Sequence, residues 1–209
     1  MAFVEIVFPQ FKKGPEIAKQ AVEKLPIAFK AFKDGGALKG LHGFIHSEDG
    51  KDVSSDCRQV IVLEWPYESA FGDFVKSPGY GTVGAALKPF ATGPAELNLF
   101  ETNDGSHVLG AGPVLEVLLG RFRNTTSDED VKAVLSKIQS TVGKTNGPPA
   151  IYGSTLNLPE KKIGIIRGFT SKAELEGAKS TSSRQEILAE IGKLAEVTQL
   201  VAEVKPIPF

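Results

Sequence analysis

Two stretches of the chain match each other: Glu5-Ile6-Val7-Phe8-Pro9-Gln10-Phe11-Lys12 near the start, and Glu116-Val117-Leu118-Leu119-Gly120-Arg121-Phe122-Arg123 in the second half. Each is an apolar strand that begins with Glu, ends with Phe and a cation, and precedes a segment with helical periodicity. The second stretch begins just past the middle of the 209 residues. A repeat of this length predicts a duplicated domain whose halves pack as a pseudo-dimer, and it is too long for a solenoid.

The remainder of each half follows one order of elements: strand, helix, strand, strand, helix, strand. In the first half, strands are predicted at 3–11, 40–46, 58–65 and 96–101, and helical regions at 15–34 and 67–90. In the second half, strands are predicted at 114–122, 151–156, 162–168 and 200–206, and capping boxes at 126–129 and 183–186 start two helices. Pro26 predicts a kink or break in the first helix, and Ser77-Pro78-Gly79 loosens the second.

This order predicts an α+β protein made of two βαββαβ ferredoxin-like repeats, at 1–104 and 105–209. Each repeat would form a four-stranded antiparallel sheet with helices on one face. The bare face of each sheet needs a cover, and the sister sheet is the nearest one. We therefore expect a barrel-like body of two sheets with the helices outside.

The composition is that of an ordinary globular protein, with 41% hydrophobic and 23% charged residues and a formal net charge of −1. No nucleic acid or membrane partner is expected, because such partners need a concentrated basic face. The single cysteine, Cys57, excludes an internal disulfide and is typical of a reducing compartment. The N-terminus lacks the features of a signal peptide, and apolar runs such as 60–63 are too short to span a bilayer. We therefore predict a cytoplasmic protein.

A further motif lies where a predicted strand enters a predicted helix: Glu64-Trp65-Pro66-Tyr67-Glu68-Ser69-Ala70-Phe71-Gly72-Asp73-Phe74-Val75-Lys76-Ser77-Pro78-Gly79-Tyr80. It resembles the signature of the dimeric α+β barrel superfamily, in which a strand ends on Glu/Val-Trp and enters a helix bearing Ala-Phe, an aromatic residue and Ser-x-x-Phe/Tyr. The motif covers under a tenth of the chain, and the duplicated element order extends the resemblance to nearly all of it.

The resemblance implies an intramolecular dimeric α+β barrel, because most members are homodimers and a fused tandem carries its own partner. A further homodimer is left open. Members include cofactor-independent monooxygenases of antibiotic biosynthesis, polyketide cyclases, heme-degrading enzymes and stress-responsive proteins. The heme-degrading branch has a pocket Trp, a heme-ligating His and a first-strand Asn where this chain has Phe74, Gly84 and Val7. Glycine cannot ligate iron, so heme binding in that mode is not expected. No cofactor is predicted.

His42, Phe44 and His46 alternate along one predicted strand, so they share a face of the sheet. A neutral imidazole can take or give a proton near pH 7, so His42 and His46 are candidate catalytic residues for a cyclase or an oxygenase. The interpretation that we favour is that the two histidines have no catalytic role and lie partly in water at a sheet edge. The two histidines are ~13 Å apart along the strand, too far to share an ion, and no metal site is predicted.

Glu5 and Glu116 occupy equivalent places in the two opening strands. A buried carboxylate there would have a raised pKa and could act as a base. The interpretation that we favour is different: each lies near the start of its strand and reaches solvent or a lysine.

The two halves differ in their reactive side chains. We match Glu64 with Arg167, and His42 with Tyr152. Thirteen of the seventeen aromatic residues lie before residue 101. A working pocket is therefore predicted in the first repeat.

The candidate ligand-binding residues are apolar and mostly aromatic: Trp65, Phe74, Tyr80, Phe44 and Val7. They suit either core packing or the wall of a pocket for a flat ligand. We predict that the first repeat binds a small hydrophobic, aromatic or polyketide-like molecule, as a cofactor-independent monooxygenase or cyclase with His42 as acid or base. The alternative is a non-catalytic stress-responsive or ligand-binding protein.

Overall fold

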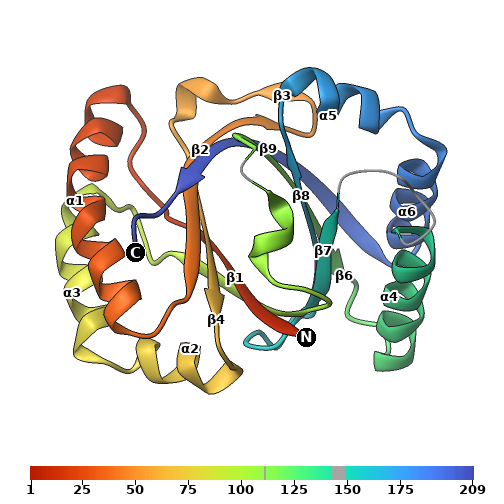
Figure 1. Cartoon of the computed structure of the whole chain (residues 1–209), viewed down its shortest axis with the longest axis horizontal. Helices are drawn as coiled ribbons and strands as arrows, with labels where there is room; N and C mark the ends of the chain where they lie inside the picture. The colour runs from red at the N-terminus through yellow and green to blue at the C-terminus, as the bar shows by residue number, and fades with distance from the viewer. Residues whose placement is uncertain (111, 143–148) are drawn as a thin grey trace.

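A computed structural model of the protein describes residues 1–110, 112–142 and 149–209, and its elements follow the duplicated order (Figure 1). The first repeat contains β1 (Ala2–Phe8), α1 (Pro15–Asp34), β2 (Lys39–Glu48), the short β3 (Lys51–Asp52), β4 (Gln59–Trp65), α2 (Glu68–Val75), α3 (Pro78–Leu87) and β5 (Glu96–Thr102). The second contains β6 (Val114–Phe122), α4 (Asp128–Val142), β7 (Ala150–Thr155), β8 (Lys162–Phe169), α5 (Lys172–Lys179), α6 (Ser182–Gly192) and β9 (Ala195–Pro206). The boundary at 104/105 stays a prediction.

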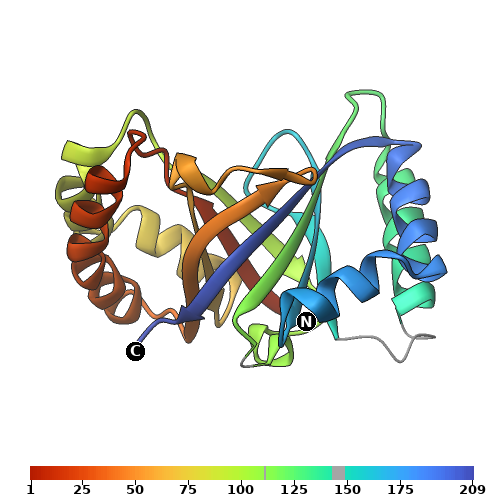
Figure 2. The same ribbon diagram turned by 90° about the horizontal axis from the view of Figure 1, so that it is seen from above.

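The strands form one closed antiparallel barrel in the described part of the chain. Their order is β2-β4-β1-β5-β7-β8-β6-β9, and β9 pairs back with β2, while β3 pairs only with β2. Each repeat supplies four neighbouring strands in the ferredoxin-like order, and the helices lie outside on the two flanks (Figures 1 and 2). The predicted α+β fold is confirmed. The two sheets meet edge to edge at two seams, and this closure leaves neither repeat with an open edge.

Each seam carries a glycine at an equivalent place. At the β2–β9 seam, a Cβ on Gly43 would lie 1.8 Å from the carbonyl oxygen of Glu203. At the β5–β7 seam, a Cβ on Gly153 would lie 1.9 Å from the carbonyl oxygen of Glu101. The strands therefore approach too closely for any other residue, and the close approach is repeated by the pseudo-symmetry.

Alternation along the strands divides the core into an interior and two outer layers. In β1, Val4, Ile6 and Phe8 fill the barrel, while Val7 packs against the helices of the first repeat. In β6, Leu118 likewise packs against the helices of the second repeat. Glu5 and Glu116 lie on the helix-facing sides of their strands for the same reason. Any site beside them is therefore outside the barrel and beneath the helices.

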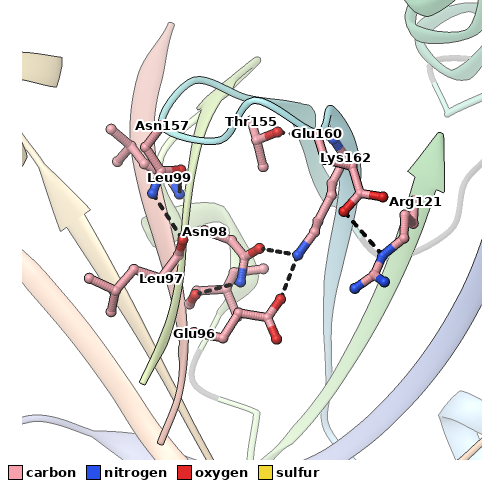
Figure 3. Close-up of polar contacts among 10 residues, drawn as sticks. Glu96, Leu97, Asn98, Leu99, Arg121, Thr155, Asn157, Glu160 and Lys162 are labelled. Carbon is pink, nitrogen blue, oxygen red and sulfur yellow. Dashed lines mark hydrogen bonds and ion pairs between the residues drawn. The ribbon is translucent and has the colours of Figure 1, made fainter. Parts of the chain in front are cut away.

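A polar network inside the barrel links the repeats (Figure 3). The Nζ atom of Lys162 on β8 lies 2.5 Å from Glu96 Oε1 and 3.0 Å from Asn98 Oδ1, both on β5. Asn157 continues the seam by donating to the carbonyl of Leu97 and accepting from the amide of Leu99, both at 2.9 Å. Burial alone would raise the pKa of Glu96, but the hydrogen bond and charge of Lys162 hold it below its ordinary value. These groups satisfy one another, so the network has a structural role.

Several local predictions need correction. Helix α1 continues past Pro26 without a break. Leu25 before the proline and Phe29 and Phe32 after it all pack against the sheet, so both parts of the helix stay in line. The first capping box of the second repeat pairs Ser127 with Asp130, one residue later than predicted.

The second predicted capping box, at 183–186, is wrong, because α6 begins at Ser182 and the side chain of Thr181 caps nothing. Helix α5 was not predicted, since it buries only Leu175 and so has no apolar stripe. None of the described helices is long and apolar enough to cross a membrane.

Candidate functional site

A cavity of about 570 Å³ lies between the first-repeat sheet and its helices. Strand β1 contributes Glu5 and Val7, and α3 contributes Tyr80 and Gly84. The remaining lining residues are mostly apolar: Pro9, Gln10, Phe11, Phe32, Ile61, Phe74, Val75, Val83, Leu87, Lys88, Ala91, Thr92, Gly93, Pro94, Ala95 and Leu97. Gly84 keeps the space open, since a Cβ there would meet no atom within 4 Å. A cavity of this size can enclose a small organic molecule.

The helical wall of the cavity is interrupted between the end of α2 at Val75 and the start of α3 at Pro78. Ser77 caps α3 by accepting a hydrogen bond from the amide of Tyr80 at 3.3 Å, and Pro78 occupies the first helical turn. The segment after α3 is tied back to the end of β1, because Thr92 donates its amide to the carbonyl of Gln10 at 2.7 Å. The break and this tie hold α3 and the following segment around the cavity.

Glu5 is the buried carboxyl group of the cavity. Its side chain is 3% exposed, and the indole Nε1 of Trp65 donates to its Oε2 at 2.9 Å. Among the described residues, Trp65 is its only hydrogen-bond donor and no cation pairs with it. Burial raises the pKa of Glu5 from 4.5 to about 7, and the Trp65 hydrogen bond opposes this rise. At neutral pH, this group can therefore either accept or donate a proton.

The favoured sequence interpretation of Glu5, a residue reaching solvent or a lysine, is wrong. Strand β1 lies between β4 and β5, and Glu5 stands in register with Leu63 on one side and Leu99 on the other. A central strand has no solvated edge, so its helix-facing side chains are covered. The period-two pattern that places Glu5 beside Val7 was the signal that could have predicted this burial.

Aromatic rings surround the carboxyl group. The Phe74 ring lies 5.3 Å from that of Trp65 and meets that of Tyr80 edge-on at 5.8 Å. Val7, Phe74 and Tyr80 line the cavity, whereas Trp65 is buried behind Phe74 and Glu5. The structure thus brings together four of the five predicted ligand-binding residues. Their part in binding stays a prediction.

His42, Phe44 and His46 lie away from this cavity, on β2. His42 is buried against the ring of Phe29 at 4.7 Å and lines a separate groove between α1 and the C-terminal segment. Burial, and then the charge of Lys205, lowers the pKa of His42 to about 4, so its imidazole is neutral at pH 7. His46 lies near Ser54 and Glu203 at the far end of the strand.

The structure places the predicted catalytic histidines away from the four predicted binding residues at the cavity, and Phe44 lies with the histidines on β2. Their catalytic role stays a prediction. Within the described ranges, no group of three or more His, Cys, Asp or Glu residues could hold a metal ion.

No protein-family model and no curated protein match the sequence. Solved structures do match along nearly the whole chain. An anthrone oxidase-like protein is 10% identical with a TM-score of 0.64, and the match covers 100% of this chain and 94% of that one. Putative monooxygenases from Fusobacterium nucleatum and Lactobacillus acidophilus are each 12% identical, with TM-scores of 0.59 and 0.57. Those matches cover 99% and 96% of this chain, and 93% of each of the other chains. The chain therefore shares the fold of these solved structures, which is the closed barrel expected from the resemblance to the dimeric α+β barrel superfamily.

In the second repeat of this tandem α+β barrel, the equivalent glutamate has different hydrogen-bond partners. Glu116 is 1% exposed, and its Oε1 accepts from Arg184 Nη2 and from Gln199 Nε2, each at 2.7 Å. Its carboxylate is therefore paired with a cation, whereas that of Glu5 is not. The interpretation that Glu116 reaches solvent or a lysine is also wrong.

The strand register corrects one match between the repeats and confirms another. Glu116 faces Arg167 as Glu5 faces Leu63, so Arg167 corresponds to Leu63 and not to Glu64. Tyr152 does correspond to His42, because each stands opposite the matching isoleucine of the neighbouring strand. The second repeat thus places a cation where the first repeat places an apolar residue.

Proposed function

We propose that the first repeat binds a small, flat, largely apolar molecule in the cavity beside Glu5 and promotes its oxygenation without a cofactor. One observation carries this proposal: a buried carboxyl group with no cationic partner among the described residues lines an apolar cavity of about 570 Å³. A buried, unpaired carboxyl group is costly to maintain, and such groups cluster at functional sites.

Glu5 is the proposed base. A ligand that carries an acidic CH2 group between aromatic or carbonyl groups would lose one proton to the Glu5 carboxylate, whose pKa of about 7 suits a base that works near neutral pH. The hydrogen bond from Trp65 would fix the carboxylate, while Phe74 and Tyr80 hold the ring of the ligand.

Dioxygen is the proposed oxidant. The electron-rich carbanion would reduce it, so that the CH2 carbon becomes a carbonyl carbon with one oxygen atom. The second oxygen atom leaves as water with the two hydrogens of the CH2 group. The reaction is balanced by one ligand and one dioxygen. The names of the structural neighbours, an anthrone oxidase-like protein and putative monooxygenases, favour this reaction over other uses of a base.

Anthrone is the probe for the test, with oxygen uptake and anthraquinone formation as readouts. Glu5→Gln should retain binding and lose about 10²–10⁴-fold in turnover, the usual contribution of a general base. Gly84→Leu should fill the cavity and abolish binding without disturbing the fold, since its Cβ meets open space. The exposed Glu23→Gln is the control and should behave like the wild type.

Binding can be followed through fluorescence, because Trp65 is the single tryptophan of the chain and contacts both Glu5 and Phe74. Full turnover in Glu5→Gln, with loss of turnover in His42→Ala, would move the role of the base to the histidine. Saturable binding without any oxygen uptake by the wild type would favour the non-catalytic ligand-binding alternative and refute the oxygenase.

A further inference from the structure

A second hollow of the first repeat is a groove of about 600 Å³ between α1 and the C-terminal segment, which lie side by side in Figures 1 and 2. Its lining residues on α1 recur every three or four positions, so they form one stripe along the helix: Val22, Leu25, Pro26, Phe29, Lys30 and Lys33. At 1.5 Å per residue, this stripe is about 16 Å long. The other lining residues are His42 of β2 and Lys205, Pro206 and Pro208 of the C-terminal segment.

The two ends of the groove differ in polarity. The stripe is apolar at the end nearer the start of α1 and carries two lysines toward the end of the helix. Lys30 is paired with Asp34 at 2.5 Å, whereas Lys33 and Lys205 form no ion pair with any residue that the structure describes. Within the described ranges, no acidic side chain lines the groove. One end of the groove therefore favours a negative charge, and the other favours an apolar group.

His42 is a buried polar side chain of the groove without a hydrogen-bond partner. It stands opposite Lys205 in the β2–β9 register, so the two side chains lie next to each other on one face. The ring is 8% exposed and forms no hydrogen bond with the described residues. Neither of its nitrogens is among the fully enclosed polar atoms, so a molecule in the groove can reach the ring. Because this imidazole is neutral at pH 7, one of its nitrogens can donate a hydrogen bond.

We propose that the groove binds an amphipathic monocarboxylate with an unbranched apolar chain, of the medium-chain fatty acid class. The carboxylate accepts hydrogen bonds from Nζ of Lys205 and from the ring N–H of His42. The chain lies in the apolar end of the groove, which extends for about 10 Å along α1 from Phe29 to Val22 and so suits an extended chain. The lysines disfavour a cation, and a small anion without a chain would leave the apolar end exposed. This site does not depend on the function proposed for the cavity beside Glu5.

The test titrates octanoate into the intact protein at constant pH and ionic strength, with calorimetry as the readout. Octanamide is the matched probe without a charge, octylammonium reverses the charge, and acetate lacks the chain. Octanoate should bind in a saturable manner, and each of the other three should bind weaker by roughly tenfold or more, because a charge-assisted hydrogen bond or the apolar contact is lost. No octanoate binding, or binding of any other probe as tight as that of octanoate, would overturn the proposal.

Three variants test where octanoate binds. Lys205→Glu should weaken the binding by roughly tenfold or more, because it places a like charge beside the carboxylate. Lys24→Glu makes the same charge change on the opposite side of α1 and should leave the affinity unchanged. Gly84→Leu, which fills the cavity beside Glu5, should leave it unchanged as well. An unchanged affinity in Lys205→Glu, or a loss of binding in Gly84→Leu, contradicts the site in the groove.

The wild-type protein gives a readout that does not depend on the folding of any variant. In NMR spectra of the protein with ¹⁵N-labelled histidine, octanoate should shift the ring signals of His42, and octanamide should shift them less. Octanoate binding that leaves the His42 signals unchanged would refute the contact and the proposed site.

Discussion

Replacing Glu5 with Gln should change the stability of the protein in a way that depends on pH. In the folded chain, burial raises the pKa of Glu5 from 4.5 to about 7. Between these two values, the folded state holds a proton that the unfolded state has released, so the free energy of unfolding falls as the pH rises. At ~1.36 kcal/mol per pKa unit, the loss by pH 8 is about 3 kcal/mol. Gln mimics the protonated form and can still accept from Trp65.

The measurement is urea unfolding of the wild type and of Glu5→Gln from pH 4 to pH 8.5, with all other titrating groups cancelling in the difference. The two proteins should be equally stable near pH 4, and the variant should be more stable by about 3 kcal/mol at pH 8. Glu23→Gln, on the exposed face of α1, should show no pH-dependent difference. A difference that stays constant across the range, or a variant less stable at pH 8, would refute the buried, unpaired state of Glu5.

Three further substitutions test neighbouring features. Glu116→Gln should destabilise the protein by about 3–5 kcal/mol in urea unfolding, because it leaves the buried Arg184 without its carboxylate; unchanged stability would contradict the ion pair. Trp65→Phe removes the hydrogen bond that lowers the pKa of Glu5, so the pH midpoint of the stability difference should move upward, and a downward shift would oppose this reasoning. Gly43→Ala places a methyl group against a carbonyl of β9 and should cost about 1–3 kcal/mol or more, as overpacking does; a neutral effect on Tm would mean that the β2–β9 seam is looser than described.

The order of strands and helices was enough to predict the fold, because the same order occurs in both halves of the chain. The period of two along β1 also places Val4, Ile6 and Phe8 on one face, and these residues fill the barrel. The seams were harder to predict, since the close approach at Gly43 depends on which strand edges meet. The pairing of strand edges depends on how the two whole sheets pack together. A single glycine in a strand does not indicate which edge it will meet.

The candidate site was predicted only in part, for a related reason. The aromatic residues Trp65, Phe74 and Tyr80 were found from one continuous motif, and the structure gathers them as neighbours. The burial of Glu5 depends instead on the middle position of β1 between two other strands, which is a tertiary property. His42 was predicted to be catalytic because its residue type titrates near pH 7. Its surroundings on β2 make it a neutral side chain packed against Phe29.

Fusion of the two repeats explains how equivalent glutamates acquired opposite environments. In a symmetric homodimer, any residue that neutralises the glutamate of one protomer also appears in the other. In a single chain the positions are independent, so Leu63 can face Glu5 while Arg167 faces Glu116. The second repeat can then retain a paired, buried charge, while the first tolerates an unpaired carboxyl group that costs about 3 kcal/mol at pH 8. A destabilising group kept in only one of two equivalent places, beside a cavity, is what selection for a site in that repeat would leave.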